Sequence, residues 1–135
     1  MAEARIPALL VLLPALALGA CGGGNDEEDI EQTVRGFVEA TKDQDAETLC
    51  GELVTQDFLE KTTGASGDKA QGECRRQLVA VQGLSVKLDR IRKTEIDGDR
   101  ATVTAVLTTQ GSPAPRVLFL EKQDGDWKLS GSRGD

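Results

Sequence analysis

Histidine and tyrosine are both absent from this 135-residue sequence, so its candidate chemistry rests on three cysteines, 23 acids and 16 bases. A hydrolytic triad of the usual kind needs a histidine and is therefore excluded. Zinc binding is disfavoured for the same reason, and no two cysteines stand as C-x-x-C. The many carboxylates leave glycosidase-type paired acids open, although no pair is marked out for that role. We therefore predict no catalytic residue, no metal site and no cofactor.

The net charge of −7 argues against nucleic acid as a partner. Affinity for nucleic acid comes largely from basic side chains that neutralise phosphates, and this sequence has no dense basic stripe. Attraction to anionic lipid headgroups is equally unsuited to an acidic chain. If this protein resides on a membrane, a covalent lipid must hold it there.

Residues 6–20 form an apolar run, IPALLVLLPALALGA, without a charged side chain. The run is shorter than the ~20 residues of a membrane-spanning helix, and it suits the hydrophobic part of a signal peptide. The preceding MAEAR is only weakly basic, which departs from the usual positive start. The run ends in Leu18-Gly19-Ala20-Cys21, which resembles the lipobox of bacterial lipoproteins.

The lipobox resemblance implies that residues 1–20 are a signal peptide and that Cys21 receives diacylglycerol on its thiol. Two acyl chains are enough for stable anchoring. Residues 21–28, rich in glycine and then in acids, would form the tether, and residues 29–135 a single domain. We therefore expect an exported protein, anchored by lipid on the outer face of the cytoplasmic membrane. The alternative is an ordinary cleaved signal peptide with a chance cysteine at its end.

Cys50 and Cys74 are the two cysteines left to pair once Cys21 is alkylated. Export to an oxidising compartment permits a disulfide between them. Closing a loop of about 25 residues would stabilise the fold by roughly 3.5 kcal/mol. The alternative is a pair of free, redox-active or metal-binding thiols. The structural bridge is favoured because the two cysteines do not form a C-x-x-C motif and the chain has no histidine.

Helical periodicity in the first half gives way to alternation in the second. Helices are predicted over residues 29–42, 46–54 and 68–82. Strands are predicted over residues 86–96, 101–109, 116–122 and 127–130. Residues 61–67 are predicted as a loop, and residues 111–115, GSPAP, as the middle connection of the sheet. Two Asp-Gly-Asp triplets, beginning at Asp97 and Asp124, predict tight turns and lack the ligand pattern of a calcium loop.

The apolar residues of the first strand change parity, which predicts a bent sheet. Val86 and Leu88 share one face, yet Ile91 has the opposite parity. A β-bulge near Asp89 and Arg90 would restore the register and bend the strand. Helices followed by such an antiparallel meander make an α+β domain, with three helices packed on a strongly curved sheet.

The order of these motifs resembles the nuclear-transport-factor-2-like superfamily, and more narrowly exported actinobacterial lipoproteins of that fold. The likeness rests on DAETLCGELV from Asp45, on Cys74, on EIDGDRATV from Glu95 and on LEKQDGDWKL from Leu120. It implies a cone-shaped domain with a cavity at its wide end. Ketosteroid isomerases and polyketide cyclases of this fold place catalysis there, with an acidic base and Tyr, Asp or His partners. This chain has no Tyr and no His, so it offers few candidates for that machinery. Many relatives bind ligands without catalysis, and dimers through the sheet are compatible with the fold.

Arg90 and Arg92 are candidates for holding an anionic ligand in such a cavity. Both share the parity of Val86 and Leu88, so without a bulge both guanidinium groups would point inward. With the bulge they face solvent, and the parity change favours that arrangement.

Three functions follow as hypotheses. The first is a non-catalytic module that binds a small ligand or an envelope protein. The second is a small-molecule isomerase or dehydratase with a carboxylate in the cavity, and the third is a structural subunit of an envelope complex. An ionisable group in the cavity would favour the enzyme.

Overall fold

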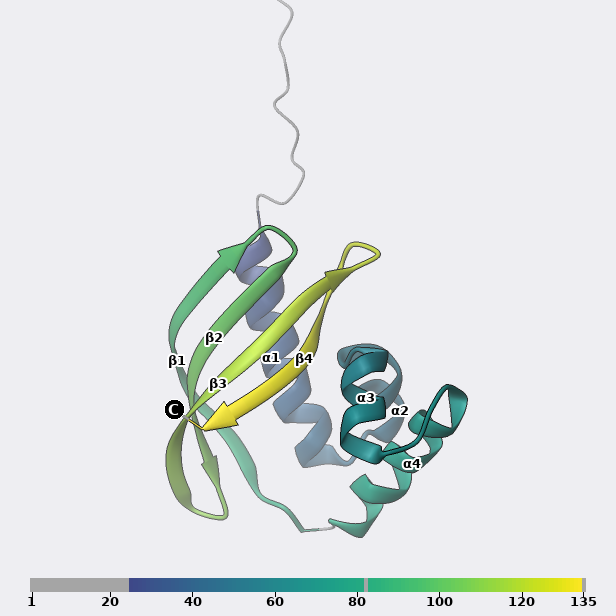
Figure 1. The fold of residues 1–135 in the computed structure, drawn as a ribbon. Helices are drawn as coiled ribbons and strands as arrows, with labels where there is room; N and C mark the ends of the chain where they lie inside the picture. Colours follow the sequence, from purple (N-terminus) through teal and green to yellow (C-terminus); the bar gives the residue numbers. More distant parts are fainter. Residues whose placement is uncertain (1–24, 82, 135) are drawn as a thin grey trace, which may run out of the picture.

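The computed structural model describes residues 25–81 and 83–134, in which helices precede a four-stranded sheet (Figure 1). The elements are α1 (Asp26–Asp43), α2 (Ala46–Thr48), the π-helix η1 (Leu49–Leu53), α3 (Gln56–Thr63), α4 (Asp68–Ala80), β1 (Val86–Asp97), β2 (Arg100–Thr109), β3 (Ser112–Gln123) and β4 (Asp126–Gly134). The sheet is antiparallel with strand order β1-β2-β3-β4. The predicted α+β class is therefore confirmed. None of the helices in these two ranges is both long and apolar enough to cross a membrane.

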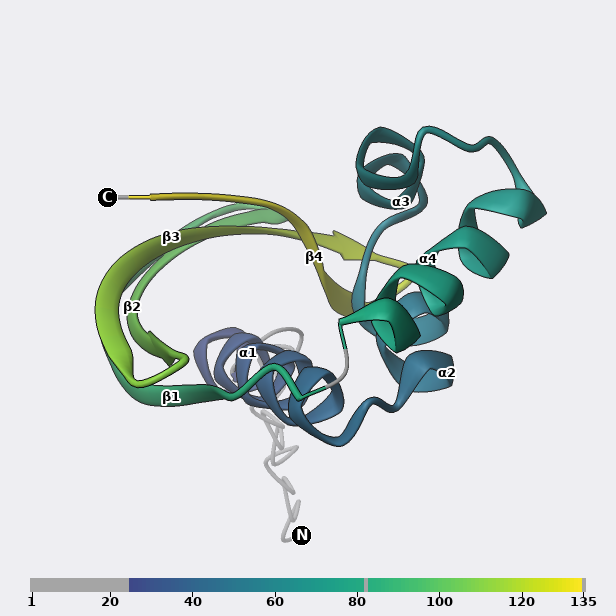
Figure 2. The ribbon, with the colours of Figure 1, turned by 90° about the horizontal axis from the view of Figure 1, so that it is seen from below.

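The sheet bends around α1, as Figure 2 shows. The predicted bulge is confirmed, because the pairing of β1 with β2 loses register between Leu88 and Arg90. A second irregularity follows between Ile91 and Lys93. Each bulge adds an unpaired residue to β1 and increases its local twist and bend. Two bulges so close together explain why the sheet is strongly curved.

The core lies between α1 and the concave face of the sheet. Ile30, Val34 and Val38 of α1 are buried and recur at the spacing of one helical face. On β2 every second residue from Ala101 to Leu107 is buried, as the predicted alternation requires. Ile30 and Val34 belong to one apolar cluster with Ala101, Val103 and Ala105 of β2 and with residues of β3 and β4.

Both Asp-Gly-Asp triplets form the predicted turns. Gly98 lies between β1 and β2 with φ of 60°. Asp124 and Gly125 join β3 to β4 with φ of 52° and 85°, as a primed hairpin turn requires. The prediction of tight turns at both motifs is therefore confirmed.

The predicted connection over residues 111–115 is wrong, because β3 begins at Ser112 and contains both Pro113 and Pro115. β4 reaches only Arg116, so residues 112–115 pair with β2 alone. The two prolines have the same parity, which directs both ring nitrogens toward the side of β3 that β4 leaves unpaired. A strand accepts proline at such an edge because no ladder hydrogen bond is lost.

The prediction of three helices is also wrong, because α3 covers residues 56–63, where no helix is predicted from the sequence. Its N-cap is Thr55, whose hydroxyl accepts from Phe58 N at 3.2 Å, and its C-cap is Gly64 with φ of 74°. The predicted loop therefore begins three residues later than expected. The predicted helix over residues 46–54 divides into α2 and η1, and α4 ends at Ala80 instead of residue 82.

The acidic run that opens the domain is the first turn of α1, where acids suit the helix dipole. Residues 26–28 are therefore helical, although the sequence assigns them to the tether. Asp26 also accepts hydrogen bonds from Lys122 Nζ at 2.8 Å and from Trp127 Nε1 at 3.1 Å. These two bonds join the start of α1 to the β3–β4 hairpin.

We predict that this junction makes stability depend on pH. The hydrogen bonds from Lys122 and then Trp127 hold the pKa of Asp26 below its usual value. Ionised Asp26 therefore stabilises the fold above the unfolded pKa of about 4, and this contribution is lost as the pH falls through the folded-state pKa. In urea unfolding between pH 7 and pH 2, Asp26→Asn should lower the midpoint most at neutral pH and least at the acidic end.

The matched control is Glu28→Gln, in the same helical turn, where the carboxylate is exposed. A midpoint difference for Asp26→Asn that does not shrink on acidification would contradict the assignment.

Candidate functional site

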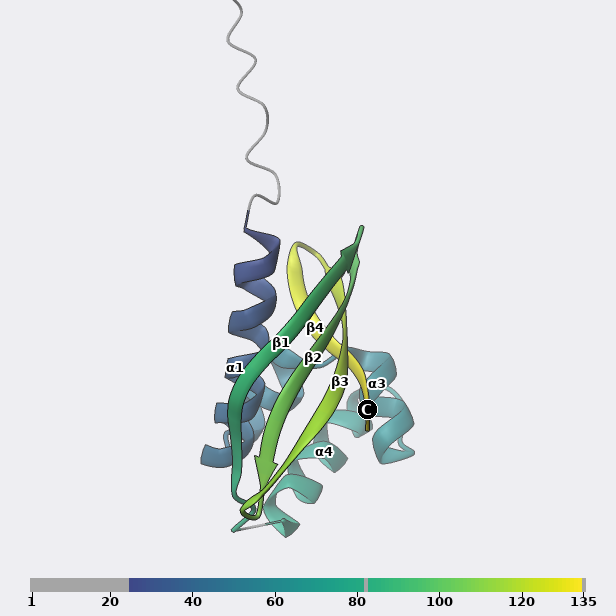
Figure 3. The same cartoon turned by 90° about the vertical axis from the view of Figure 1, so that its left-hand side faces the viewer.

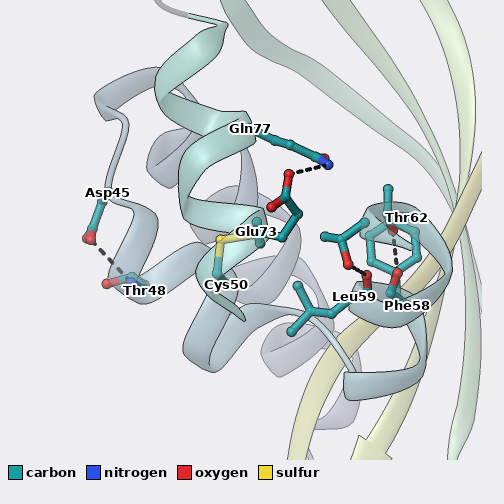
Figure 4. The surroundings of a disulfide bond; sticks show 10 residues. Asp45, Thr48, Cys50, Phe58, Leu59, Thr62, Glu73 and Gln77 are labelled. Carbon is teal, nitrogen blue, oxygen red and sulfur yellow. Dashed lines mark hydrogen bonds between the residues drawn. A yellow bond between two sulfur atoms is a disulfide. The ribbon is translucent and has the colours of Figure 1, made fainter. Parts of the chain in front are cut away.

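A disulfide joins Cys50 in η1 to Cys74 in α4, with an S–S distance of 2.03 Å and a sequence separation of 24 (Figure 4). The predicted structural bridge is therefore confirmed. Cys50 is 1% exposed, whereas Cys74 is half-buried. The bridge links two helical segments that otherwise bury few side chains, since α4 buries only Ala70 and Leu78.

An apolar pocket of about 310 Å³ lies beside this bridge. Its lining side chains come from α1, η1, α3, α4 and the residues that follow η1 and α4: Phe37, Leu49, Val54, Phe58, Leu59, Thr62, Thr63, Cys74, Gln77, Leu78 and Val81. None of these residues is ionisable. The resemblance implies a cavity at the wide end of the cone, whereas the lining residues of this pocket all lie outside the strands. The space under the sheet is instead occupied by buried residues of α1, β2, β3 and β4.

The hydroxyl groups in the pocket lining are already committed as donors. Thr63 Oγ1 donates to Leu59 O at 2.7 Å, and Thr62 Oγ1 donates to Phe58 O. Both bonds lie within α3, so neither hydroxyl proton is available to a ligand. The remaining polar group is the amide of Gln77, which extends from α4 toward α3 (Figure 4).

The carboxylate nearest this amide is Glu73, one turn earlier on α4. It accepts from Gln77 Nε2 at 3.5 Å and forms an ion pair with Arg76. Its side chain is 30% exposed, and Glu73 is not among the lining residues.

Comparison with known proteins identifies the fold. No protein-family profile matches the chain, and no curated protein sequence does. A cystatin-like protein of unknown function from Nostoc punctiforme has a TM-score of 0.58 at 16% identity, covering 78% of this chain and 86% of that one. A protein provisionally named a ketosteroid isomerase, from Shewanella frigidimarina, has a TM-score of 0.57 at 20% identity, covering 77% and 92%. An NTF-2-like protein of unknown function from Shewanella oneidensis has a TM-score of 0.53 at 15% identity, covering 79% and 96%.

The fold is nuclear-transport-factor-2-like. Identities this low specify the fold and no activity. The apolar pocket of this chain lies in the helical layer, outside the strands.

The arginines predicted as candidates for an anion site lie on β1, and both are exposed. Arg90 follows the first bulge, and Arg92 stands at the second. Neither lines the apolar pocket. Cys21, the signal peptide over residues 1–20 and the glycines of the tether lie outside the described residues.

Two further hollows flank α1. A polar groove of about 530 Å³ lies between the start of α1, η1 and the β3–β4 turn, where Asp29, Glu52 and Asp126 meet Lys128. A second groove of about 430 Å³ lies between α1 and the start of β1, where Arg35, Lys42 and Lys87 gather. The sequence suggested neither, because each needs residues far apart in the chain.

We predict that the Cys50–Cys74 bridge contributes roughly 3.5 kcal/mol to the free energy of unfolding, because it constrains the unfolded chain. The double variant Cys50→Ser/Cys74→Ser should show a lower urea midpoint, and reductant should lower the wild-type midpoint by a similar amount. Reductant should leave the variant unchanged, which is the internal control. Equal midpoints for the oxidised wild type and the variant would contradict this role.

Proposed function

We propose that this protein is a lipid-anchored, extracytoplasmic binding protein that holds a small apolar molecule in the helix-lined pocket, without catalysis. The observation that supports this most directly is the lining, which combines apolar side chains with threonine hydroxyls that donate within their own helix. Burial of apolar ligand surface against such a lining is favourable, and the lining offers few hydrogen-bond partners.

The pocket limits the size and polarity of its ligand. A volume of about 310 Å³ is at the lower end of small-molecule sites, which suits a short alkyl chain or one or two fused rings. A charged group on the ligand would lose its hydration without gaining an opposite charge, because no described lining residue is ionisable. One neutral polar group can be satisfied by the amide of Gln77.

The same lining argues against an isomerase or dehydratase. Those reactions need an acid or base within hydrogen-bond reach of the substrate. Glu73 is the nearest such group on α4, but it is engaged by Gln77 and Arg76 outside the lining. The likeness to a structure named after an isomerase extends to the fold only.

Membrane attachment in this proposal rests on Cys21 and the apolar run that precedes it. Cys21 stands five positions before the start of α1, so a short segment would join the lipid to the domain. The disulfide supports the extracytoplasmic part of the proposal, because such bridges persist mainly in oxidising compartments.

Val81 and Val79 provide a matched test of the pocket. Both are exposed, at 46% and 54%, but only Val81 lines the pocket. Val81→Asp places a carboxylate that loses hydration when an apolar ligand enters, so the affinity for the neutral fluorescent probe N-phenyl-1-naphthylamine should fall roughly tenfold. Val79→Asp, which adds the same charge outside the lining, should leave the affinity within about twofold.

Both variants should unfold at nearly the wild-type urea midpoint, because both sites are exposed in the folded chain. Equal probe affinity in Val81→Asp and wild type would reject the apolar pocket as the binding site. A folded wild type that does not bind any neutral apolar probe would reject the proposed function.

We also predict that Cys21→Ser removes the lipid. In a bacterial host, wild type should fractionate with membranes and gain the mass of a diacylglyceryl group, whereas Cys21→Ser should be released or remain as precursor. The Cys50→Ser/Cys74→Ser variant should stay on the membrane. Membrane retention of Cys21→Ser equal to wild type would refute the anchor.

A further inference from the structure

We propose that the groove between α1 and β1 is a second binding site, for a phosphate monoester attached to a short apolar group. We call it the basic groove and define it by Arg35, Val38, Glu39 and Lys42 of α1 with Lys87 and Leu88 of β1. It shares no lining residue with the apolar pocket. The proposal is therefore independent of the function proposed above.

Two elements far apart in sequence bring the cations of this groove together. Arg35, Glu39 and Lys42 are spaced by four and three residues, which places them on one face of α1. β1 runs beside α1, as Figure 3 shows, and Lys87 enters the groove from near the start of this strand. Three positive side chains thus border one hollow in a chain whose net charge is −7.

These cations have little internal compensation. Within residues 25–81 and 83–134, neither Arg35 nor Lys42 forms an ion pair, although Glu39 stands at i+4 from the first and i−3 from the second. Lys87 pairs with Asp89 at 3.5 Å, with the lysine side chain 75% exposed. An exposed pair of this kind contributes little to stability, so Lys87 is free to turn toward a ligand.

The charge of the groove matches a phosphate monoester better than a carboxylate. When Lys87 turns from Asp89 toward a ligand, the three cations and the carboxylate of Glu39 give the lining a net charge of about +2. A phosphate monoester carries about −1.5 to −2 at neutral pH. A guanidinium group can also donate two parallel hydrogen bonds to phosphate oxygens. A carboxylate ligand would leave about one positive charge uncompensated.

The groove also has an apolar part, which is why the ligand needs more than its phosphate. Val38 is only 6% exposed, and Leu88 is half-buried. Burying an alkyl group against these side chains would add the hydrophobic contribution that free phosphate lacks. Octyl phosphate has both features and serves as the probe, with octyl glucoside and free phosphate as its uncharged and headgroup-only counterparts.

The test measures octyl phosphate binding to the full chain by calorimetry, below the micelle concentration. Arg35→Gln/Lys42→Gln/Lys87→Gln should weaken binding at least tenfold. The control Lys61→Gln/Lys69→Gln/Arg75→Gln removes the same three charges from exposed positions on α3 and α4 and should stay within twofold of wild type. Octanoate and free phosphate should bind more weakly than octyl phosphate. The affinity for octyl glucoside should be the same in the groove variant and in wild type.

An equal loss of octyl phosphate affinity in both triple variants would overturn the proposal, because the loss would then depend on the net charge of the protein and not on the groove. Unchanged affinity in the groove variant would overturn it as well, and octanoate binding as tight as octyl phosphate would overturn the phosphate assignment. Binding of N-phenyl-1-naphthylamine should be the same in the groove variant and in wild type. The two probes therefore test the two sites independently, because loss of binding at one site does not require loss of binding at the other.

Discussion

Packing of α1 into the bend of the sheet is the interaction on which the other parts of the domain depend. Small side chains on β2, Ala101 and Ala105, are fully or nearly buried on the concave face and leave room for the apolar stripe of α1. Each fully buried valine or isoleucine of that stripe contributes roughly 1.5–3 kcal/mol of transfer free energy. The bulges at Asp89 and Arg92 make the fit possible, because a flat sheet would contact the helix along a narrow line. With only three phenylalanines and one tryptophan, the core relies on this close aliphatic packing.

Because α1 fills the bend, the remaining helices form a second layer with less to bury. α3 buries Leu59 alone, and α4 buries Ala70 and Leu78. So few buried side chains cannot hold two helices firmly, and the disulfide supplies a covalent link between η1 and α4. The apolar pocket arises in this layer, where Cys74 is both part of the link and part of the lining. The bridge therefore stabilises the wall of the site as well as the fold.

Sequence alone predicts the features that depend on neighbouring residues. Parity along β1 locates the bulge, and Asp-Gly pairs locate the turns, because each signal is contained in a few consecutive residues. It misses α3, whose eight residues are too short for a clear helical period, and it misreads Pro113 and Pro115, which are compatible with a strand only because β4 stops at Arg116. The pairing of Cys50 with Cys74 could be predicted because the expected lipidation of Cys21 would leave these two cysteines as the one possible pair. The basic groove could not, since Arg35 and Lys87 meet only when α1 lies along β1.

One helix thus separates two surfaces of opposite chemistry. Phe37 reaches the apolar pocket, whereas its neighbour Val38 lines the basic groove, because successive residues of a helix point about 100° apart. The buried stripe of α1 holds this orientation, since turning the helix would expose Ile30 and Val34, which are at most 1% exposed. Side chains on either surface can therefore be substituted while α1 stays in place. Between α1 and the sheet the described residues form an apolar core, and the apolar pocket and the basic groove both lie at its edges.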